Sequence, residues 1–495
     1  MANPVSMLAF DIGAESGRVM LGLLADGRLH LREQYRFANH PVRLPDGLHW
    51  DILHLWAEML AGLSLAAKLP ETKITSIGLD TWGVDFALLD GNGALAGLPY
   101  HYRDSRTAGM MQAAFNLVPR EEIFAATGIQ FMQINTLYQL LSLVQQQSPV
   151  LEIARSFLTI PDLLNYWLTG KQVNEFSIAT TTQCYDPRQG DWAYALIKKL
   201  GIPPQLFGPI VQPGTVIGSL RMPLADECGL AGVPVVAPAC HDTGSAVAAV
   251  PAEKPGFAWI SSGTWSVMGV EWPAPLINDQ SLALNITNEG GVEGTFRVSK
   301  NIMGLWLVQE CRRTWMHQEA NDLSYTELTR LAAEAQPFQA VVDPDYPTFL
   351  PPGDMPERIR AFCRKTGQIV PETKGAVIRC VLEGIALKYR WVLEHLEQML
   401  DTRLDPIHIV GGGTQNELLS QLAADCTGKV VLAGPVEATA MGNLLMQAKA
   451  LGLIGSLSEL RAVVRRSCVV KRYEPSPDCR WDVAFTRLND LIHQE

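Results

Sequence analysis

Polar residues gather where a predicted strand passes into a predicted helix, in the segment CHDTGSA. The apolar run that begins at Val233 is followed by His241, Asp242, Thr243 and Ser245. Ligands of open α/β sheets bind at the carboxyl ends of strands, so Asp242 is a candidate catalytic residue. An Asp at this point is also an ordinary helix N-cap, and the pattern alone leaves both roles open.

Two strand–turn–strand patterns in different parts of the chain offer turns of small residues. In SMLAFDIGAESGRVMLGLL, Asp11 lies near the end of an apolar run, and the turn Gly13–Gly17 leads into a second run. FAWISSGTWSVMGVEW repeats the pattern and places Ser261, Ser262 and Thr264 in its turn. The backbone amides of such turns can approach phosphate, but the same residues also suit ordinary hairpins. Neither segment matches GxxxxGK[ST] or GxGxxG, so the common nucleotide fingerprints do not decide between the two interpretations.

The segment GGGTQN resembles a dinucleotide-binding turn only in part. Gly411 and Gly413 occupy its first two glycine positions, but Asn416 stands where the third glycine is required. We therefore expect either a close approach to adenosine or ribose, or a simple strand-to-helix turn.

The segment DTWGVD places two carboxylates and an indole around Gly83. Asp80 and Asp85 are a pair of the kind that glycosidases use, but they can also accept hydrogen bonds from sugar hydroxyls, with Trp82 as an apolar platform. A tight turn with a buried tryptophan explains the same residues. Since the chain has no GxSxG, HExxH or SxxK motif, readings as a serine hydrolase, a zinc protease or a β-lactamase lack their signature residues.

Hydrophobic periodicity predicts the elements that position these motifs. Strands are expected on both sides of the first turn and again in LREQYRFAN, followed by a helix after Asp51 and two short strands around DTWGVD. Helices are predicted at Ile134–Leu143 and at Pro161–Gly170, with Gly170 ending the second. GAVIRCVLEGIALKYRWVLEHLEQML predicts a long amphipathic helix, and PIHIVGGGTQNELLSQLAADCTGKVVLAG predicts strand, turn, helix and strand. This alternation indicates the α/β class.

A chain of 495 residues with 47% hydrophobic and 18% charged residues exceeds what one hydrophobic core usually serves. We predict two domains, residues 1–245 and 246–495, with a cleft between them as the place for chemistry. The echo between the two hairpins suggests that the halves are related.

The net charge, the N-terminal sequence and the cysteines indicate which binding partners and which cellular location to expect. A formal net charge of −11 disfavours binding to nucleic acid or to an anionic membrane. The N-terminal sequence has no signal-peptide pattern and no apolar run is long enough for a membrane span, so we expect a cytoplasmic protein. The nine cysteines form no CxxC pair, which argues against a zinc ribbon or a thioredoxin-like centre.

In this order, DIGAESGR, DTWGVD, LTGK with EFSIATTT, CHDTGSA, SSGTWS, NIMGLWLVQ and IVGGGTQN resemble the FGGY family of carbohydrate kinases from Ala9 to about Pro475. The resemblance implies two domains, each with an actin-like or ribonuclease-H-like α/β core. It also implies that the domains close on ATP and Mg²⁺. Residues 1–245 would form the sugar side with the first phosphate hairpin, and residues 246–495 the nucleotide side.

The resemblance also implies roles for individual residues. Asp242 matches the catalytic base of the family, and Asp11 matches a Mg²⁺ partner that acts through water. The expected nucleotide contacts are Ala14, Glu15, Ser16, Gly17, Arg18, Thr264, Gln309 and Gly412. The expected sugar contacts are Trp82, Gly83, Asp85, His241, Asp242, Thr243 and Asn301. Many family members have Thr at position 14 and a bulkier residue at position 17, so backbone amides are expected to carry more of the phosphate binding here.

Within the family, TWGVDF, HDTGSA, SSGTWSVMG, NITNEGG and NIMGLW resemble the members that phosphorylate L-rhamnulose at its 1-hydroxyl. Another ketose or polyol, such as L-fuculose or L-xylulose, is the first alternative. The second is an actin-like ATP-driven switch, which would share the phosphate turns but would not need the HDT cluster. A monomer and a homodimer are both compatible with the sequence.

Cys363 and Cys380 flank the turn-forming stretch KTGQIVPETKG between two predicted helices. An antiparallel helix pair would bring the two side chains together. A disulfide is one outcome, although a reducing cytoplasm argues against it.

Overall fold

The computed structural model describes residues 4–69, 73–319 and 323–493, which divide into two compact units. Unit 1 comprises Met1–Ala249, Glu271–Val298 and Ala438–Ser467, and unit 2 comprises Val250–Val270, Ser299–Glu437 and Cys468–Glu495. The units therefore do not follow from one cut in the chain, because two later segments belong with the N-terminal part. The division of the sequence into related halves at residue 245 stays a prediction.

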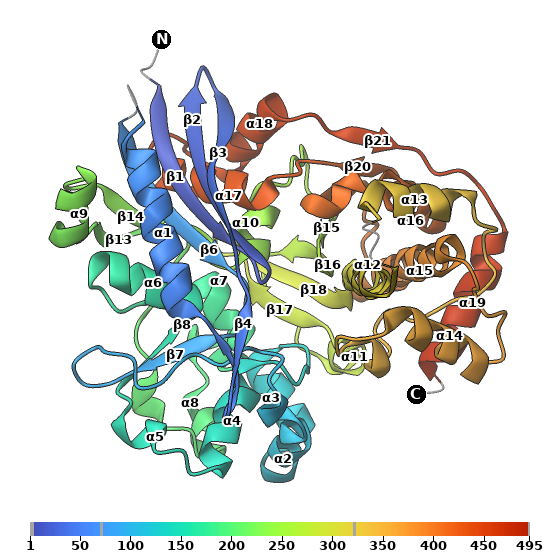
Figure 1. Ribbon diagram of the computed structural model, residues 1–495, viewed down its shortest axis with the longest axis horizontal. Coiled ribbons are helices and arrows are strands. Elements are labelled where there is room, and N and C mark those ends of the chain that lie inside the picture. The colour runs from blue at the N-terminus through green and yellow to red at the C-terminus, as the bar shows by residue number, and fades with distance from the viewer. Residues whose placement is uncertain (1–3, 70–72, 320–322, 494–495) are drawn as a thin grey trace. The chain divides into compact units, whose positions relative to one another are not determined.

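The core of unit 1 is a six-stranded sheet in which β1, β2 and β3 lie side by side (Figure 1). β1 pairs antiparallel with β2 and parallel with β6, and β6 pairs parallel with β14. The central strand is almost wholly apolar because both of its faces are covered. The strands in sheet order are β13 (Thr215–Ser219), β14 (Pro234–Ala237), β6 (Ile74–Thr81), β1 (Val5–Ile12), β2 (Ser16–Ala25) and β3 (Arg28–Ala38).

Helices cover both faces of this sheet. α1 (Ile52–Ala67) packs its Gly62 against Val19, whereas α17 (Ala438–Ala450) packs Leu444 against Gly22. Since side chains three positions apart on a strand point to opposite faces, α1 and α17 lie on opposite sides of the sheet. Asp51 caps α1 by accepting a hydrogen bond from the His54 amide at 3.0 Å, as expected for the start of this helix.

The remaining elements of unit 1 surround the sheet or form an α-helical layer with short strands. The helices are α2 (Met110–Leu117), α3 (Arg120–Thr127), α4 (Thr136–Gln145), α5 (Val150–Ile153), α6 (Ile160–Thr169), α7 (Phe176–Ala179), α8 (Tyr194–Lys199), α9 (Met222–Cys228), α10 (Asp242–Ala248), α11 (Asp279–Ala283) and α18 (Leu457–Ser467). The strands are β4 (Pro41–Leu44), β5 (Gly47–Trp50), β7 (Phe86–Leu89), β8 (Ser156–Thr159), β9 (Asn174–Glu175), β10 (Tyr185–Asp186), β11 (Asp191–Trp192), β12 (Ile210–Val211) and β17 (Thr287–Gly290). The predicted stop of α6 is confirmed, since Gly170 follows it in the left-handed region with φ 76°.

Unit 2 is built on a second sheet and also contains the long helix α15 (Lys374–Leu400). β15 and β16 form the predicted hairpin, and β19 continues the sheet parallel to β15. The strands are β18 (Phe296–Met303), β16 (Trp265–Trp272), β15 (Ala258–Ser262), β19 (Ile407–Val410), β20 (Val431–Ala433) and β21 (Lys471–Tyr473), and the unit boundary runs through β16 and β18. The other helices are α12 (Trp306–Glu319), α13 (Tyr325–Glu334), α14 (Met355–Lys365), α16 (Glu417–Thr427) and α19 (Arg480–His493).

Cys363 on α14 and Cys380 on α15 are buried free thiols. Their side chains are close neighbours, since a hydrogen bond between them lowers the pKa of Cys363 and raises that of Cys380. The expected proximity is therefore confirmed, and the disulfide stays a prediction. None of the helices in the described part of the chain combines the length and the apolar character that a bilayer crossing requires.

Candidate active site

Three strands of unit 1 end at one edge of the sheet and bring acidic residues there. Asp11 on β1 is the register partner of Asp80 on β6, and the Thr81 amide donates to the carbonyl of Cys240 after β14 at 2.9 Å. Asp242 follows two residues later at the start of α10. The parallel order of β1, β6 and β14 is the reason why motifs more than 200 residues apart converge.

Asp80 is the buried member of this acidic group. Burial raises its pKa well above the ordinary value, and the charges of Asp11 and Asp242 add to the effect. Asn443 on α17 opposes the shift by donating its side-chain amide to the Asp80 carboxylate at 2.6 Å. Asp80 is fully buried and bonded to α17, so its surroundings differ from those of an acceptor for sugar hydroxyls, which is one of the roles that the sequence leaves open.

The hairpin turn after β1 is closed by its own backbone. The Gly13 amide donates to the Ser16 carbonyl at 2.9 Å, and Arg18 pairs with Asp11 at 2.5 Å. Gly17 has a packing reason, because a Cβ atom there would lie 2.2 Å from the Phe37 ring. The predicted phosphate contacts Ala14, Glu15 and Ser16 form the tip of this turn.

Asp242 is not the N-cap of α10. The capping position belongs to His241, and Asp242 is the first residue inside the helix, so the N-cap reading of this residue is wrong. Its Oδ1 atom accepts hydrogen bonds from the amide and the hydroxyl of Thr243, at 2.5 and 3.2 Å. Oδ2 accepts no hydrogen bond from any residue that the structure describes, and the side chain is 32% exposed. One oxygen is therefore held and the other is available to a ligand.

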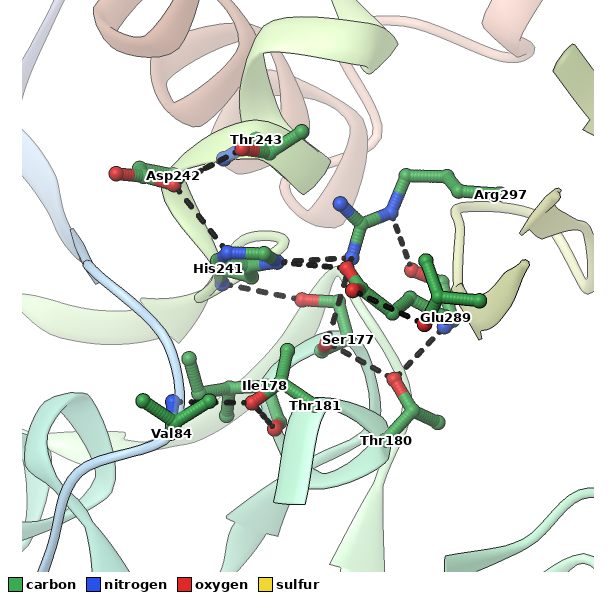
Figure 2. Close-up of polar contacts among 12 residues, drawn as sticks. Val84, Ser177, Ile178, Thr180, Thr181, His241, Asp242, Thr243, Glu289 and Arg297 are labelled. Carbon is green, nitrogen blue, oxygen red and sulfur yellow. Dashed lines mark hydrogen bonds and ion pairs between the residues drawn. The ribbon is translucent and has the colours of Figure 1, made fainter. Parts of the chain in front are cut away.

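His241 joins Asp242 to a buried ion pair, as Figure 2 shows. Its Nε2 atom lies 3.4 Å from Oδ1 of Asp242. Its Nδ1 atom lies 3.0 Å from Nη2 of Arg297 and 3.3 Å from Oε2 of Glu289. Arg297 and Glu289 contact each other at 3.1 Å.

The segment EFSIATTT holds the backbone next to His241. Glu175 is fully buried, and its carboxylate accepts hydrogen bonds from the amides of Ser177, Ile178 and Cys240. Ser177 in turn accepts a hydrogen bond from the His241 amide at 3.2 Å. Burial raises the pKa of Glu175 to about 6, although these donors and the Ser177 hydroxyl oppose the shift. Glu175 thus fastens the strand end that carries His241 and Asp242.

Gly83 lies directly beside the imidazole. A Cβ atom at this position would lie 3.2 Å from Nε2 of His241 and 3.3 Å from Oγ1 of Thr181, which also accepts a hydrogen bond from the Val84 amide. The absence of a side chain at Gly83 therefore keeps Nε2 of His241 accessible.

Asp85 and Trp82 are bound into a network of their own. Asp85 accepts hydrogen bonds from the indoles of Trp50 and Trp82, at 2.6 and 2.9 Å, and from the Gln139 side chain and the Tyr102 amide. Burial raises the pKa of Asp85 to about 6 despite these donors. Both carboxylate oxygens bind protein groups, so in this structure Asp85 organises the aromatic wall, and its predicted sugar contact stays a prediction.

The predicted nucleotide contacts of unit 2 come together around the end of β15. Gln309 on α12 donates to the Thr264 hydroxyl at 3.2 Å. Gly411 and Gly413 pack against Ser262, where Cβ atoms would approach it to 3.0 and 2.0 Å, whereas Gly412 is exposed with open space around it. Asn301 lies on β18 within unit 2.

Sequence reasoning missed four residues that shape this site: Glu175, Thr181, Glu289 and Arg297. Three of them belong to segments that the family resemblance quoted, EFSIATTT and NITNEGG, but no local pattern pointed to their contacts in this site. Within residues 4–69, 73–319 and 323–493, no group of three or more His, Cys, Asp and Glu side chains is placed to hold a metal ion.

Comparison with solved structures identifies the fold. The fold is similar to gluconate kinase from Lactobacillus acidophilus, with a TM-score of 0.80, 16% identity, and coverage of 99% of this chain and 97% of the other. Xylulose kinase from Rhodospirillum rubrum gives a TM-score of 0.77 at 20% identity and covers 99% of both chains. The architecture is thus the actin-like two-domain fold of sugar kinases.

Sequence comparison gives the family. Residues 6–249 match the N-terminal domain and residues 258–451 the C-terminal domain of the FGGY family of carbohydrate kinases. The rhamnulokinase of Bacteroides thetaiotaomicron is 44% identical over 98% of this chain and 99% of its own length, and that of Oceanobacillus iheyensis is 42% identical over 93% and 96%. The chain belongs to the FGGY family of carbohydrate kinases. It is a sugar kinase, of a family whose members use ATP.

Proposed function

We propose that this enzyme transfers the γ-phosphate of ATP to the 1-hydroxyl of L-rhamnulose, giving L-rhamnulose 1-phosphate and ADP in the catabolism of L-rhamnose. The proposal rests above all on identities of 41–44% to several rhamnulokinases over nearly the whole chain. The reaction takes place in the cytoplasm, where ATP is available, and the enzyme acts as a monomer or a homodimer.

Asp242 is the base in this proposal. Phosphoryl transfer depends on in-line placement and on charge stabilisation, and the acceptor hydroxyl must lose its proton as the new bond forms. Thr243 holds Oδ1, so Oδ2 is the oxygen that orients the hydroxyl and accepts its proton. A positioned base of this kind contributes roughly 10² to 10⁴ in rate.

We assign the Mg²⁺ ion that is bound with ATP to Asp11. Its carboxylate offers hard oxygen atoms of the kind that Mg²⁺ prefers. Asp11 would hold the ion through water, and the ion would neutralise charge on the phosphates. The turn with Ala14, Glu15, Ser16, Gly17 and Arg18 contacts phosphate through its backbone, and Thr264, Gln309 and Gly412 contact the nucleotide from unit 2.

Sugar recognition is assigned to residues of the family motifs. Gly83 leaves Nε2 of His241 open, and Thr243, Asn301, Trp82 and Asp85 complete the proposed sugar contacts. Each of these roles comes from the position of the residue in a family motif.

A coupled assay of ADP release tests the substrate. L-rhamnulose should be the best acceptor in the presence of ATP and Mg²⁺, compared with L-fuculose, L-xylulose, D-xylulose and glycerol at equal concentration. Equal or faster turnover of any of the other four would overturn the assignment of L-rhamnulose and leave the kinase class intact.

A further inference from the structure

The buried ion pair behind His241 is a feature that the catalytic roles above do not use. Arg297 is fully buried on β18, and Glu289 is buried on β17, in the same unit as His241. A buried charge is costly unless it is paired, and such pairs often fix an arrangement rather than add stability. The pair lies directly against the imidazole, so we asked which arrangement of the ring it selects.

Arg297 is held so that one nitrogen faces the imidazole. Its Nε donates to the Gly290 carbonyl at 2.9 Å, and its Nη2 lies 3.1 Å from Oε2 of Glu289 and 3.0 Å from Nδ1 of His241. Burial alone would raise the pKa of Glu289, but the adjacent Arg297 guanidinium lowers it. Glu289 is therefore an ionised carboxylate that keeps the guanidinium in place.

The guanidinium determines which ring nitrogen of His241 carries the proton. Arginine donates hydrogen bonds and never accepts them, so a proton on Nδ1 of His241 would point at the N–H of Nη2 across 3.0 Å. A neutral imidazole that accepts at Nδ1 carries its proton on Nε2. Nη2 then donates to Nδ1 of His241, while the carboxylate of Glu289 balances the charge of the guanidinium as an ion pair at 3.1 Å. In the competing arrangement, Nδ1–H donates to Glu289 at 3.3 Å. The contact of 3.0 Å between Nδ1 and Nη2 of Arg297 would then place two N–H groups against each other and be repulsive.

We propose that Arg297, anchored by Glu289, fixes His241 as the neutral tautomer with its proton on Nε2, and that this N–H donates to an oxygen atom of the ketose. This N–H faces Oδ1 of Asp242 at 3.4 Å and the open space that Gly83 leaves. Arg297 and Glu289 are thus positioning residues for sugar binding. The inference rests on the proposed function in so far as it takes His241 and Asp242 as the lining of the sugar site.

The first test measures the tautomer directly in the full-length wild-type enzyme. The protein is labelled with ¹⁵N-histidine, and long-range ¹H–¹⁵N correlation spectra are recorded, with the His241 signals identified by their absence in His241→Gln. We expect a pyrrole-like shift for Nε2 and a pyridine-like shift for Nδ1. The reverse pattern, or two pyrrole-like shifts from a charged ring, overturns the proposal.

The second test compares two substitutions of the imidazole. Gln extends far enough to place an amide N–H near the position of Nε2, whereas Asn reaches only as far as Nδ1. We expect His241→Gln to keep kcat/KM for the sugar at least about 10-fold above that of His241→Asn, because it retains a donor towards the substrate. KM for ATP should stay within about twofold of wild type in both. Equal losses in the two variants, or a smaller loss in His241→Asn, contradict the proposal.

The third test concerns the ion pair itself. Arg297→Lys keeps the charge but loses the fork that serves Gly290, Glu289 and His241 together. We expect a fall of about 10-fold or more in kcat/KM for the sugar and a mixture of His241 tautomers in the spectra. Glu383→Gln, which breaks the buried Arg379–Glu383 pair on α15 in unit 2, is the matched control and should leave both readouts unchanged. A folded Arg297→Lys enzyme with an unchanged tautomer and wild-type kinetics overturns the role of Arg297.

Failure of this inference can be told apart from failure of the proposed function. An enzyme that phosphorylates L-rhamnulose and shows the Nδ1–H tautomer disproves only the inference. An enzyme that shows the Nε2–H tautomer and prefers another sugar disproves only the substrate assignment.

Discussion

Asp242 carries the proposed chemistry, and its two oxygens have different surroundings. Asp242→Asn keeps an oxygen that can accept from the Thr243 amide but removes the ability to take a proton. We expect kcat to fall by roughly 10² or more with KM for ATP little altered, because the lost interaction is made mainly in the transition state. Steady-state kinetics with L-rhamnulose and ATP measure this.

The same substitution separates a base from a structural residue. Since Asn preserves the local hydrogen bond at the start of α10, the melting temperature should stay near that of wild type. An Asp242→Asn enzyme with near-normal turnover would refute the proposed mechanism, and a large loss of melting temperature would show that the residue acts on folding instead.

Asp85 is a carboxylate that cannot be replaced by an amide without the loss of a hydrogen bond. It receives hydrogen bonds from Trp50, Trp82, Gln139 and the Tyr102 amide, and all of these groups are donors. Asp85→Asn turns an N–H₂ group towards at least one of them and leaves a buried donor unsatisfied. We expect a loss of about 1–3 kcal/mol in the free energy of unfolding, measured by urea denaturation.

Asp90 provides the control for this prediction. It is a partly exposed loop residue whose Oδ1 accepts from the amides of Asn92 and Ala94, and Asn can keep both bonds. Asp90→Asn should change the unfolding free energy by less than about 0.5 kcal/mol. Equal effects at positions 85 and 90 would show that the aromatic network around Asp85 contributes nothing specific.

At the scale of elements, the packing of α10 on α17 fixes the helix that begins with Asp242. Gly442 on α17 lies so close to α10 that a Cβ atom there would meet the Ser245 carbonyl oxygen at 1.8 Å. Gly442→Ala must therefore push the two helices apart. We expect a loss of about 1–3 kcal/mol in stability, with reduced kcat because Asp242 moves with its helix.

Gly91→Ala is the matched control, since a Cβ atom there finds its nearest neighbour at 3.9 Å and the backbone is not left-handed. Both variants are compared by urea denaturation and by kcat for L-rhamnulose. A Gly442→Ala enzyme as stable and as active as Gly91→Ala would show that the helix contact tolerates an added methyl group.

Lys300 on β18 and Lys388 on α15, both in unit 2, make the free energy of unfolding depend on pH. Burial, and then repulsion by Lys388, lower the pKa of Lys300 to about 8 from 10.5. The unfolded chain therefore binds more protons between these two values, and the stability of the wild type rises with pH across that window. Lys300→Met lacks this titration. It should be more stable than wild type at pH 7, by up to about 3 kcal/mol, and the difference should shrink from pH 8 to 10.5.

Urea denaturation of both proteins at pH 7, 8.5 and 10 measures the difference. A stability difference that is constant with pH, or that grows as the pH rises, contradicts the assigned direction of the Lys300 shift.

Elements with a strong local pattern could be predicted from the sequence. The two hairpins, the helix after Asp51, the end of α6 at Gly170 and the strand–turn–helix–strand segment around Gly411 all agree with the structure. Each depends on hydrophobic period, capping or turn chemistry within about twenty residues, which sequence spacing records directly.

Contacts between distant segments were not predictable in this way. Nothing in NITNEGG indicates that Glu289 meets His241, because that contact depends on how β17 lies against α7 and on the register of β18. The role of Gly17 was read as room for phosphate, whereas the structure shows that it also makes room for Phe37 on the neighbouring strand. Sequence patterns therefore identify candidate residues, whereas the contacts of these residues depend on tertiary packing.

At the scale of the whole molecule, unit 1 is assembled from three separate stretches of chain. The last stretch supplies α17, from which Gln447 donates to the Leu8 carbonyl at 3.0 Å and Asn443 donates to Asp80. It also places Leu444 against Gly22 on the face of the sheet that α17 covers. A chain that ends before this stretch leaves that face uncovered.

A fragment of residues 1–253 should therefore not fold on its own, although it contains the whole match to the N-terminal family domain. The cut lies in the exposed segment 253–256, so it interrupts no helix or strand. Co-expression with residues 254–495, which carry Glu271–Val298 and Ala438–Ser467, should restore a cooperative urea transition and kinase activity. The fragment alone should show neither, because the uncovered sheet face and the unpaired Asp80 outweigh its own packing. A cooperative unfolding transition for residues 1–253 alone would show that this domain folds without the later segments and would contradict the prediction.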